Sequence, residues 1–348
     1  MLIVAIAGTN LYMLIEKAIP IFRPTKVLFL GCIAILLMLL SSCNERKDQK
    51  ILYFAHSLPT SHPVHKGILV MQEALNEKSG GKLQIKIFPD SQLGSEREAL
   101  ELLQIGSIAM TKVSASALSN FAPEYQITVI PYLFRDSEHL FKNLEGEVGK
   151  QLLESGTEYL LRGVCFYDAG ARSFYTKDRP VNSPDDLDGL KVRVQNDQMS
   201  VDMANTLGAA ATPMSFGELY TALQQNVVDG AENNIPSFVS SNHFEVCKYY
   251  IFDEHTMVPD VVIIGTKFWN LLSDEEKGWL DAAAKESVVK QKQFWKETIV
   301  ENMKMLEEAG VEFLYPDKEP FAKKSKPVME RLMKNPQLKP IIDKINSN

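Results

Sequence analysis

Two arginines are the side chains best suited to chemistry with an organic acid. Arg193 stands between Val192 and Val194 in a short predicted strand. Side chains alternate along a strand, so the two valines mark the buried face and Arg193 points the other way, into a cleft or into solvent. Arg172 follows Gly170, which permits backbone bending between lobes; a hinge-stabilising salt bridge is the alternative role for this arginine. A planar guanidinium offers two parallel donors that match a carboxylate, so two arginines together predict a ligand with at least one carboxylate.

Polar side chains near other predicted strand ends complete the expected pocket. His56 and Ser57 end the first strand, where open α/β sheets place their ligand crevice, and Lys112 ends another strand. The amide of Asn233 can both donate and accept a hydrogen bond, whereas Glu232 is expected to brace an arginine. Besides the two arginines, the expected ligand-binding residues are Asn196, Asn233, Asn234, Phe216, His56, Ser57, Glu96, Lys112, Tyr175 and Glu232.

This set favours a sugar acid over a four-carbon dicarboxylate such as succinate. A sugar acid needs one carboxylate clamp and many acceptors for its hydroxyl groups, whereas a dicarboxylate needs a second strong cation. Two of these residues also have structural interpretations, because Asn234 could cap a turn and Phe216 could belong to the core. Glu218 needs no ligand to explain it, since Ser215-x-x-Glu218 is a capping box.

Other kinds of site find less support in the sequence. The spacing of His56, His62 and His65 fits no standard metal site, and no cysteine–histidine spacing suggests zinc. Cys165 and Cys247 could form a disulfide, but their apolar surroundings favour buried thiols. The chain has neither a Gly-x-Ser-x-Gly elbow nor a His-Glu-x-x-His motif. We therefore expect no enzyme, metal or cofactor; a sugar-acid lyase or hydrolase and a ligand sensor for a membrane receptor are the rival classes.

The composition and the order of elements suit an α/β protein. The chain has 348 residues, of which 45% are apolar and 23% charged, and a net charge of −7. It has no basic block, which argues against a nucleic-acid partner. A strand at 51–56, a helix at 63–79, a strand at 83–87 and a helix that ends at Gly106 follow one another, as in a lobe with a largely parallel sheet.

A long predicted helix sets the arrangement of two lobes. Ser273 to Glu276 is a capping box that opens a helix able to run to Glu308, about 50 Å long at about 1.5 Å per residue. Such a helix could cross two lobes. We expect a two-lobe, periplasmic-binding-protein-like fold of type II with a hinge. The expected boundaries are 51–169 with 259–298 for lobe I, and 170–258 with 299–348 for lobe II.

The N-terminal segment predicts export. Residues 27–40 form an unbroken apolar run behind three basic residues, too short for a comfortable membrane span. The run ends in Leu-Ser-Ser-Cys, which resembles the lipobox of bacterial lipoproteins. We expect a signal peptide at 1–42, a lipid on Cys43, a tether at 43–50 and a folded part outside the cytoplasm, anchored to a membrane by the lipid. An uncleaved anchor helix is the alternative, and translation could start at Met13.

Six segments have a recognisable pattern, in order and at a characteristic spacing. They are Ser-Gln-Leu-Gly at 91–94, Ile-Pro-Tyr-Leu-Phe at 130–134, Leu-Asp-Gly-Leu-Lys-Val-Arg-Val at 187–194, Pro-Met at 213–214, Glu-Leu-Tyr-Thr-Ala-Leu-Gln at 218–224 and Val-Asp-Gly-Ala-Glu-Asn at 228–233. Each is weak by itself. Together they resemble the solute-binding proteins of tripartite ATP-independent periplasmic (TRAP) transporters, of the dicarboxylate-binding (DctP) type, over residues 51–315.

The resemblance implies roles for individual residues. Arg193 matches the arginine that binds the ligand carboxylate bidentately, and Arg172 matches a second ligand-facing arginine. Phe216 matches an aromatic residue that stacks on the ligand, and Asn233 matches the asparagine that follows Asp-Gly-x-Glu. Some members have a carboxylate where this chain has Ser114, and the run 232–238 resembles the uronate- and aldonate-binding branch, so a hexuronate such as glucuronate or galacturonate is the expected ligand. The resemblance also implies two partners, a small and a large integral membrane subunit driven by an ion gradient and not by ATP.

Overall fold

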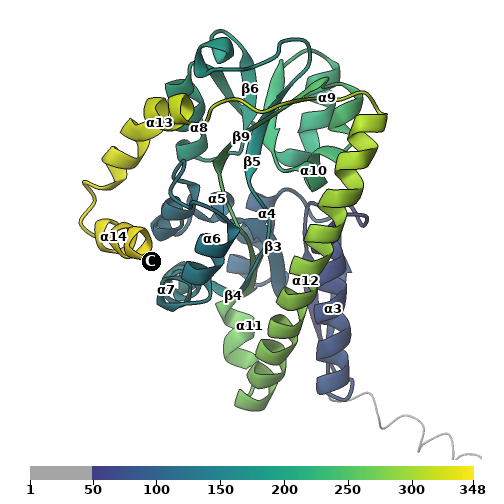
Figure 1. The fold of residues 1–348 in the computed structure, drawn as a ribbon. Coiled ribbons are helices and arrows are strands. Elements are labelled where there is room, and N and C mark those ends of the chain that lie inside the picture. The colour runs from purple at the N-terminus through teal and green to yellow at the C-terminus, as the bar shows by residue number, and fades with distance from the viewer. Residues whose placement is uncertain (1–48) are drawn as a thin grey trace, which may run out of the picture. The chain divides into compact units, whose positions relative to one another are not determined.

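Two β-sheets organise the described part of the chain, residues 49–348 of a computed structural model (Figure 1). The predicted signal peptide and Cys43 lie outside the described residues. The first sheet has the order β2-β1-β3-β10-β4, with β1 (Lys50–Ala55), β2 (Leu83–Phe88), β3 (Met110–Ser114), β4 (Leu161–Tyr167) and β10 (Asp260–Gly265). The second has the order β11-β9-β5-β8-β6-β7, with β5 (Arg172–Thr176), β6 (Lys191–Val194), β7 (Ala210–Pro213), β8 (Gly230–Asn233), β9 (Tyr249–Thr256) and β11 (Glu312–Leu314).

Helices accompany each sheet and define two lobes. Lobe I combines the first sheet with α3 (Pro63–Lys78), α4 (Glu96–Ile105), α5 (Ala115–Leu118), α6 (Ser137–Leu144), α7 (Glu147–Ser155) and α11 (Thr266–Leu271). Lobe II combines the second sheet with α8 (Gln198–Leu207), α9 (Leu219–Gln224) and α10 (Ile235–Ser240). The chain ends in α12 (Asp274–Glu308), α13 (Glu319–Leu332) and α14 (Lys339–Ser347). Short 3-10 helices occur at Pro123–Val129, Gly156–Tyr159, Pro184–Leu187, Phe216–Glu218 and His243–Glu245.

Each sheet is parallel except for one strand, as far as the described residues show. β10 runs antiparallel to β3 and β4, and β5 runs antiparallel to β8 and β9, while the remaining pairs are parallel. Both inverted strands follow a crossing between the lobes: the chain passes from β4 to β5 and returns from β9 to β10. The predicted lobe with a largely parallel sheet is therefore confirmed. Short crossings of this kind are where two lobes can hinge.

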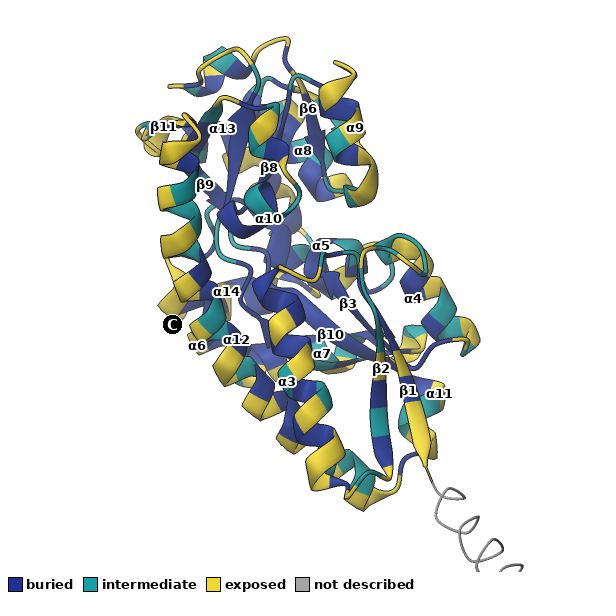
Figure 2. Ribbon diagram, turned by 90° about the vertical axis from the view of Figure 1, so that its right-hand side faces the viewer, coloured by how far each residue is buried: buried dark blue, intermediate teal, exposed yellow. Residues whose placement is uncertain are grey.

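Helix α3 shows how local sequence builds lobe I. Pro63 occupies the first turn, where no backbone N–H is needed, and His62 caps the helix by accepting a hydrogen bond from the Val64 N–H. Ile68 and Met71, at helical spacing, are fully buried. The helix packs this face against β2 and α12, and Figure 2 shows its other face exposed.

Helix α12 joins the two lobes. Ser273 and Glu276 form the predicted capping box at its start, and the helix runs for 35 residues to Glu308. Leu280 belongs to a core cluster of lobe I, whereas Leu306 belongs to a cluster of lobe II. The helix packs against α3 in lobe I and against α10 in lobe II (Figure 1). The predicted long helix and the two-lobe α/β fold are therefore confirmed.

The C-terminal helices depart from the expected lobe boundary. α13 packs against α8, and its Phe321 is buried in a core cluster of lobe II. α14 packs instead against α7, with Ile341, Ile342 and Ile345 buried in the core of lobe I. The expected boundaries place all of 299–348 in lobe II. The last helix differs because its three isoleucines form one apolar face that only the surface of lobe I covers.

The cysteines of the described chain are free. Cys165 lies in β4 and Cys247 lies just before β9, and both are buried, as the apolar surroundings predicted. Within residues 49–348, no helix combines the length and the apolar character needed to cross a membrane.

Candidate functional site

A cavity of about 260 Å³ is lined by residues of both lobes. Its volume lies just below the range of about 300–1,000 Å³ that is typical of small-molecule sites. The predicted residues that line it are Arg172, Arg193, Asn196, Phe216, Asn233, Asn234, Ser57, Glu96 and Lys112.

The second sheet brings the two arginines together. β8 lies between β5 and β6. Arg193 of β6 pairs with Ala231 of β8, and Ser173 of β5 pairs with Asn233 of β8. Because β5 runs antiparallel to β8, the start of β5, with Arg172, meets the ends of β6 and β8. Segments far apart in the sequence therefore present their polar side chains at one edge of this sheet.

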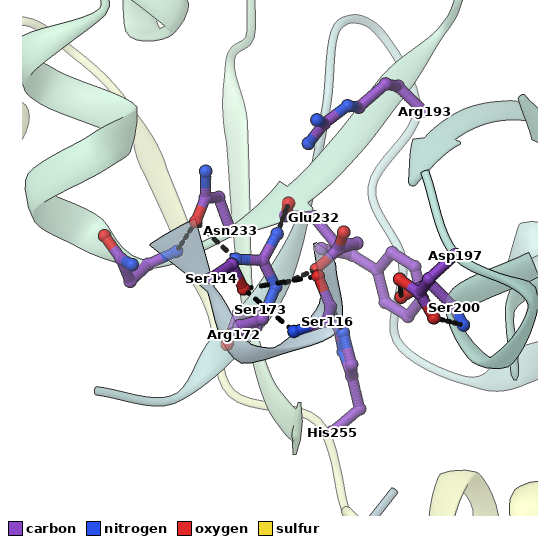
Figure 3. Close-up of polar contacts among 12 residues, drawn as sticks. Ser114, Ser116, Arg172, Ser173, Arg193, Asp197, Ser200, Glu232, Asn233 and His255 are labelled. Carbon is purple, nitrogen blue, oxygen red and sulfur yellow. Dashed lines mark hydrogen bonds and ion pairs between the residues drawn. The ribbon is translucent and has the colours of Figure 1, made fainter. Parts of the chain in front are cut away.

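Arg193 has a buried guanidinium with one unpartnered nitrogen. The residue is 3% exposed. Its Nε and Nη2 both donate to the carbonyl oxygen of Met214, at 3.1 and 2.9 Å, so the backbone sets the orientation of the guanidinium. Nη1 has no hydrogen-bond partner among the described residues. Burial lowers the pKa of Arg193. Figure 3 shows the guanidinium pointing from β6 toward Arg172 and Asn233.

Phe216 borders the same arginine. Its ring centroid lies 5.9 Å from Arg193 Cζ, and the residue lines the cavity. Beside it, Ser215 and Glu218 form the predicted capping box. Glu218 therefore has a structural partner, as the sequence analysis inferred.

Arg172 is bound by the protein through all three of its nitrogens. Nε donates to Glu232 Oε2 at 2.5 Å, Nη1 to Asn233 Oδ1 at 2.8 Å, and Nη2 to the carbonyl oxygen of Glu232 at 2.8 Å (Figure 3). The Glu232 carboxylate balances the charge of Arg172, which is the salt bridge that the sequence analysis held as an alternative. Arg172 nevertheless lines the cavity. Arg172 therefore both forms a salt bridge and lines the cavity.

His255 supplies a second positive partner for Glu232. Its Nδ1 lies 2.7 Å from Asp253 Oδ2, and its Nε2 lies 3.6 Å from Glu232 Oε2. Burial lowers the pKa of His255, but the two carboxylates outweigh burial and raise this pKa to about 9. Burial also raises the pKa of Glu232, but Arg172 and His255 outweigh it and lower this pKa to about 2. The imidazole is therefore protonated, and Glu232 ionised, at neutral pH.

We expect the free energy of unfolding to fall between pH 6.5 and about 9 because of His255. Its pKa rises from 6.5 to about 9 on folding, so its contribution is complete below pH 6.5 and is lost as pH rises through about 9. The loss is on the order of 3 kcal/mol, from about 1.4 kcal/mol per pKa unit. Urea unfolding of the wild type and of His255→Gln across this pH range measures it. In His255→Gln the free energy of unfolding should no longer fall over this pH range. An equal fall in the wild type and the variant would contradict the raised pKa assigned to His255.

The wall contributed by lobe I holds a buried lysine between two carboxylates. Lys112 Nζ donates to Asp260 Oδ1 at 3.1 Å and to Glu96 Oε1 at 3.3 Å. The Ser114 N–H also donates to Glu96 Oε1, at 3.0 Å. Burial raises the pKa of Asp260, Lys112 opposes this shift and Glu96 adds to it, so that the pKa is about 6. This wall offers carboxylate acceptors and an ammonium group that is already paired.

Asparagines orient the site and join its two sides. Asn233 Oδ1 accepts one hydrogen bond from the Asn234 N–H at 2.9 Å and another from Arg172 Nη1. Asn234 Oδ1 accepts from the Ser237 N–H at 2.9 Å and so caps α10, which is the structural role that the sequence analysis left open. Asn120 Nδ2 of lobe I donates to the carbonyl oxygen of Asn196 of lobe II at 2.9 Å.

Three residues of the expected ligand set, His56, Tyr175 and Glu232, do not line the cavity. His56 Nε2 lies 3.0 Å from His65 Nδ1 within lobe I. The Tyr175 hydroxyl lies 2.8 Å from His243 Nδ1, and its ring packs in an aromatic cluster of lobe II. Glu232 forms an ion pair with Arg172, as expected. The polar atoms of His56 and Tyr175 thus have protein partners away from the cavity, whereas Glu232 binds Arg172 of the lining through Oε2 and its Oε1 has no hydrogen-bond partner among the described residues.

The structure adds residues that the sequence analysis overlooked. Asp260, Gln195 and Ser237 line the cavity. Gln195 could have been found, because it lies two residues after Arg193 in an extended segment and so faces the same way. Asp260 opens β10 and pairs with Ser114 of β3, a long-range register that no local pattern reveals. Ser237 carries no signal of its own beyond its place in the run 232–238, which resembles the uronate- and aldonate-binding branch.

The charges of the cavity leave one cation without an anionic partner among the described residues. Glu232 balances Arg172, and Glu96 and Asp260 balance Lys112. Arg193 alone has only a backbone carbonyl. A buried, unpaired charge is costly, so this position favours the binding of an anionic group. No group of three or more histidine, cysteine or acidic side chains within residues 49–348 could hold a metal ion.

Comparisons with known proteins agree with this chemistry. Residues 54–335 match the model of the DctP family, bacterial extracellular solute-binding protein, family 7. A solved TRAP periplasmic solute-binding protein from Anaerococcus prevotii, with bound D-glucuronate, is 40% identical with a TM-score of 0.84, and the match covers 86% of this chain and 98% of that one. Another, from Bradyrhizobium sp. BTAi1 in complex with D-galacturonate, is 38% identical with a TM-score of 0.84 and coverage of 86% and 100%. The C4-dicarboxylate-binding protein DctB of Bacillus subtilis is 32% identical over 257 residues, 74% of this chain and 72% of that protein.

Proposed function

This chain belongs to the DctP family of bacterial extracellular solute-binding proteins, and from this membership we propose that it captures a hexuronate, D-glucuronate or D-galacturonate, for a TRAP transporter. Members of the family are transport proteins that bind small organic acids outside the cytoplasm and work with membrane permease subunits.

The unpartnered Nη1 of Arg193 carries the proposal. It lies in a cavity where every other buried cation of the described lining has a carboxylate partner. A ligand carboxylate at this position would form charge-assisted hydrogen bonds, and the backbone already holds the guanidinium in place. One uncompensated cation corresponds to one ligand carboxylate. Arg172 and Asn233 line the same side and would contact the ligand next to it.

The lobe I wall favours a sugar acid over a four-carbon dicarboxylate. A second ligand carboxylate would face Glu96 and Asp260, which already share the charge of Lys112. Hydroxyl groups, by contrast, can donate to these carboxylates. The solved relatives with bound glucuronate and galacturonate support the same choice. The similarity to a C4-dicarboxylate-binding protein keeps succinate as the alternative to be tested.

Ligand capture would join the two lobes. The cavity has walls from both lobes, and two short crossings connect them. In the proposed cycle, the carboxylate is bound by lobe II, the hydroxyl groups by lobe I, and the closed form is recognised by a small and a large integral membrane subunit that use an ion gradient.

A lipid on Cys43 would hold the protein at the membrane. The support is the lipobox-like Leu-Ser-Ser-Cys that follows the apolar run at 27–40. Mass spectrometry of the mature protein extracted from membranes should find an N-terminal diacylglycerol-modified cysteine. A Cys43→Ser variant should be released into the soluble fraction, and equal membrane retention of both forms would refute lipid anchoring.

Isothermal titration of the mature domain tests the ligand. D-Glucuronate and D-galacturonate should bind tightly, D-gluconate more weakly, and succinate not measurably. Tight succinate binding together with silent sugar acids would overturn the hexuronate assignment in favour of a dicarboxylate. Analysis of the titrated ligand for new products separates binding from turnover, because a binding protein returns its ligand unchanged.

A further inference from the structure

We infer that His62, a residue of lobe I outside the cavity lining, positions the Ser237 hydroxyl of lobe II as a hydrogen-bond donor to the ligand. This inference rests on the proposed function and assigns a specificity role within the same site. It has two parts. His62 donates to Ser237 and never accepts from it, and the hydroxyl proton of Ser237 is thereby directed to the cavity.

The helix cap of α3 sets the proton position on His62. The Val64 N–H donates to His62 Nδ1 at 3.2 Å, so Nδ1 acts as an acceptor. A neutral imidazole with an acceptor at Nδ1 carries its proton on Nε2. His62 Nε2 lies 3.3 Å from Ser237 Oγ, so the Nε2–H donates to this hydroxyl oxygen. A backbone hydrogen bond in one lobe thus decides the direction of a side-chain hydrogen bond to the other.

The surroundings of His62 keep its imidazole neutral. The residue is 1% exposed, and burial lowers its pKa well below 6.5; the positive charges of Lys112 and Lys66 act in the same direction. The direction of the hydrogen bond is therefore the same throughout the neutral pH range.

Ser237 has one hydroxyl proton and no protein acceptor for it among the described residues. Its backbone N–H is used by Asn234 Oδ1, and its Oγ receives the proton of His62. The residue is 4% exposed and lines the cavity, so the remaining O–H direction is toward the ligand space. A ligand must then present an acceptor there, such as a carboxylate or ring oxygen. Cationic groups are disfavoured at this point.

Helix α12 packs beside both residues of this pair. The His62 ring lies 5.8 Å from the Trp295 ring of α12, centroid to centroid. α12 packs against α3, which begins beside His62, and against α10, which contains Ser237. The long helix therefore holds the donor and the acceptor in register between the lobes.

A double-mutant cycle tests the inference. Ser237→Ala removes the donor and should weaken the affinity for D-glucuronate or D-galacturonate roughly tenfold, the range of a hydrogen bond to a charged or strongly polar acceptor. His62→Asn keeps a favourable helix cap for the Val64 N–H but is too short to reach Ser237, so affinity should fall several-fold. In the Ser237→Ala background, His62→Asn should have no further effect on the Kd.

Additional variants separate positioning from structural support. His62→Gln retains a donor of greater reach and should recover part of the affinity lost in His62→Asn. His65→Asn, on the same helix but outside the cavity lining, should leave the Kd unchanged. Two results would overturn the inference. One is that His62→Asn lowers the affinity equally in the wild type and in Ser237→Ala, and the other is that Ser237→Ala leaves the Kd unchanged.

The cycle also separates this inference from the ligand assignment. It is carried out with whichever of D-glucuronate, D-galacturonate and succinate the wild type binds, since each offers acceptor oxygens. If the wild type binds succinate and the effects of the two substitutions on the Kd are not additive, the hexuronate proposal is refuted and the inference about His62 is supported. Uronate binding with an additive cycle would keep the proposal and remove the inference.

Discussion

Replacement of Arg193 by methionine is expected to abolish high-affinity uronate binding without reducing the stability of the fold. The guanidinium is buried, its Nη1 has no partner, and its other donors reach only the Met214 carbonyl oxygen. Methionine retains much of the side-chain volume and removes the charge. Since a buried charge without an anionic partner costs free energy, the thermal midpoint of the unliganded variant should equal or exceed that of the wild type.

The loss of affinity should be large. Removing one partner of a buried, hydrogen-bonded charge pair costs about 2–5 kcal/mol, which corresponds to roughly 30-fold to several thousand-fold in Kd. Arg193→Lys keeps the charge but not the planar fork, so it should bind more weakly than the wild type and more tightly than Arg193→Met. Calorimetric titration and thermal unfolding, with and without ligand, measure both effects.

Arg97 provides a matched control. It lines the mouth of the same cavity, but its side chain is 69% exposed and pairs with Glu101 at 3.0 Å. Arg97→Met removes the same charge from a solvated position, where screening makes it matter little. It should leave the Kd within a few-fold of the wild-type value. Retained micromolar affinity in Arg193→Met would contradict the role assigned to Arg193.

Replacement of Glu232 by glutamine is expected to destabilise the fold strongly. The carboxylate lies 2.5 Å from Arg172 Nε and 3.6 Å from His255 Nε2, and all three side chains are buried. The neutral amide leaves the charge of Arg172 without its anionic partner. Breaking a buried ion pair in this way typically costs about 3–5 kcal/mol. Urea unfolding at neutral pH measures the change.

An exposed ion pair serves as the control for this substitution. Glu154 lies 3.7 Å from Arg162, but its side chain is 68% exposed. Glu154→Gln should therefore change the unfolding midpoint little. If Glu232→Gln proves as stable as this control, the ion pairs of Glu232 with Arg172 and His255 do not contribute measurably to the stability of the fold.

The elements that build the fold were largely predictable because their signals are local. The alternation at 83–87, the apolar spacing in α3 and the capping box at Ser273 each depend on a few neighbouring residues. The assignment of α14 failed for the opposite reason. Its apolar face could be recognised in the sequence, but which lobe would cover that face depends on where α7 lies.

The residues of the site divide in the same way. A strand end pointed to Lys112 and the family resemblance to Asn233, and both residues line the cavity. The expected set also contained Tyr175, whose hydroxyl turns to His243 inside lobe II. Asp260 escaped notice because its relation to Lys112 arises only when β10 pairs with β3.

By itself, the sequence predicted an exported α/β protein with two arginines suited to an organic acid, because an apolar N-terminal run, amphipathic periods and residue chemistry can each be recognised in short stretches of chain. Only the tertiary structure decided which of the two arginines lacks an anionic partner in the protein. Glu232 neutralises Arg172 from 60 positions away, whereas Arg193 receives only a backbone carbonyl. Charge compensation depends on distances of a few ångströms between separate segments, and those distances exist only after the strands have paired.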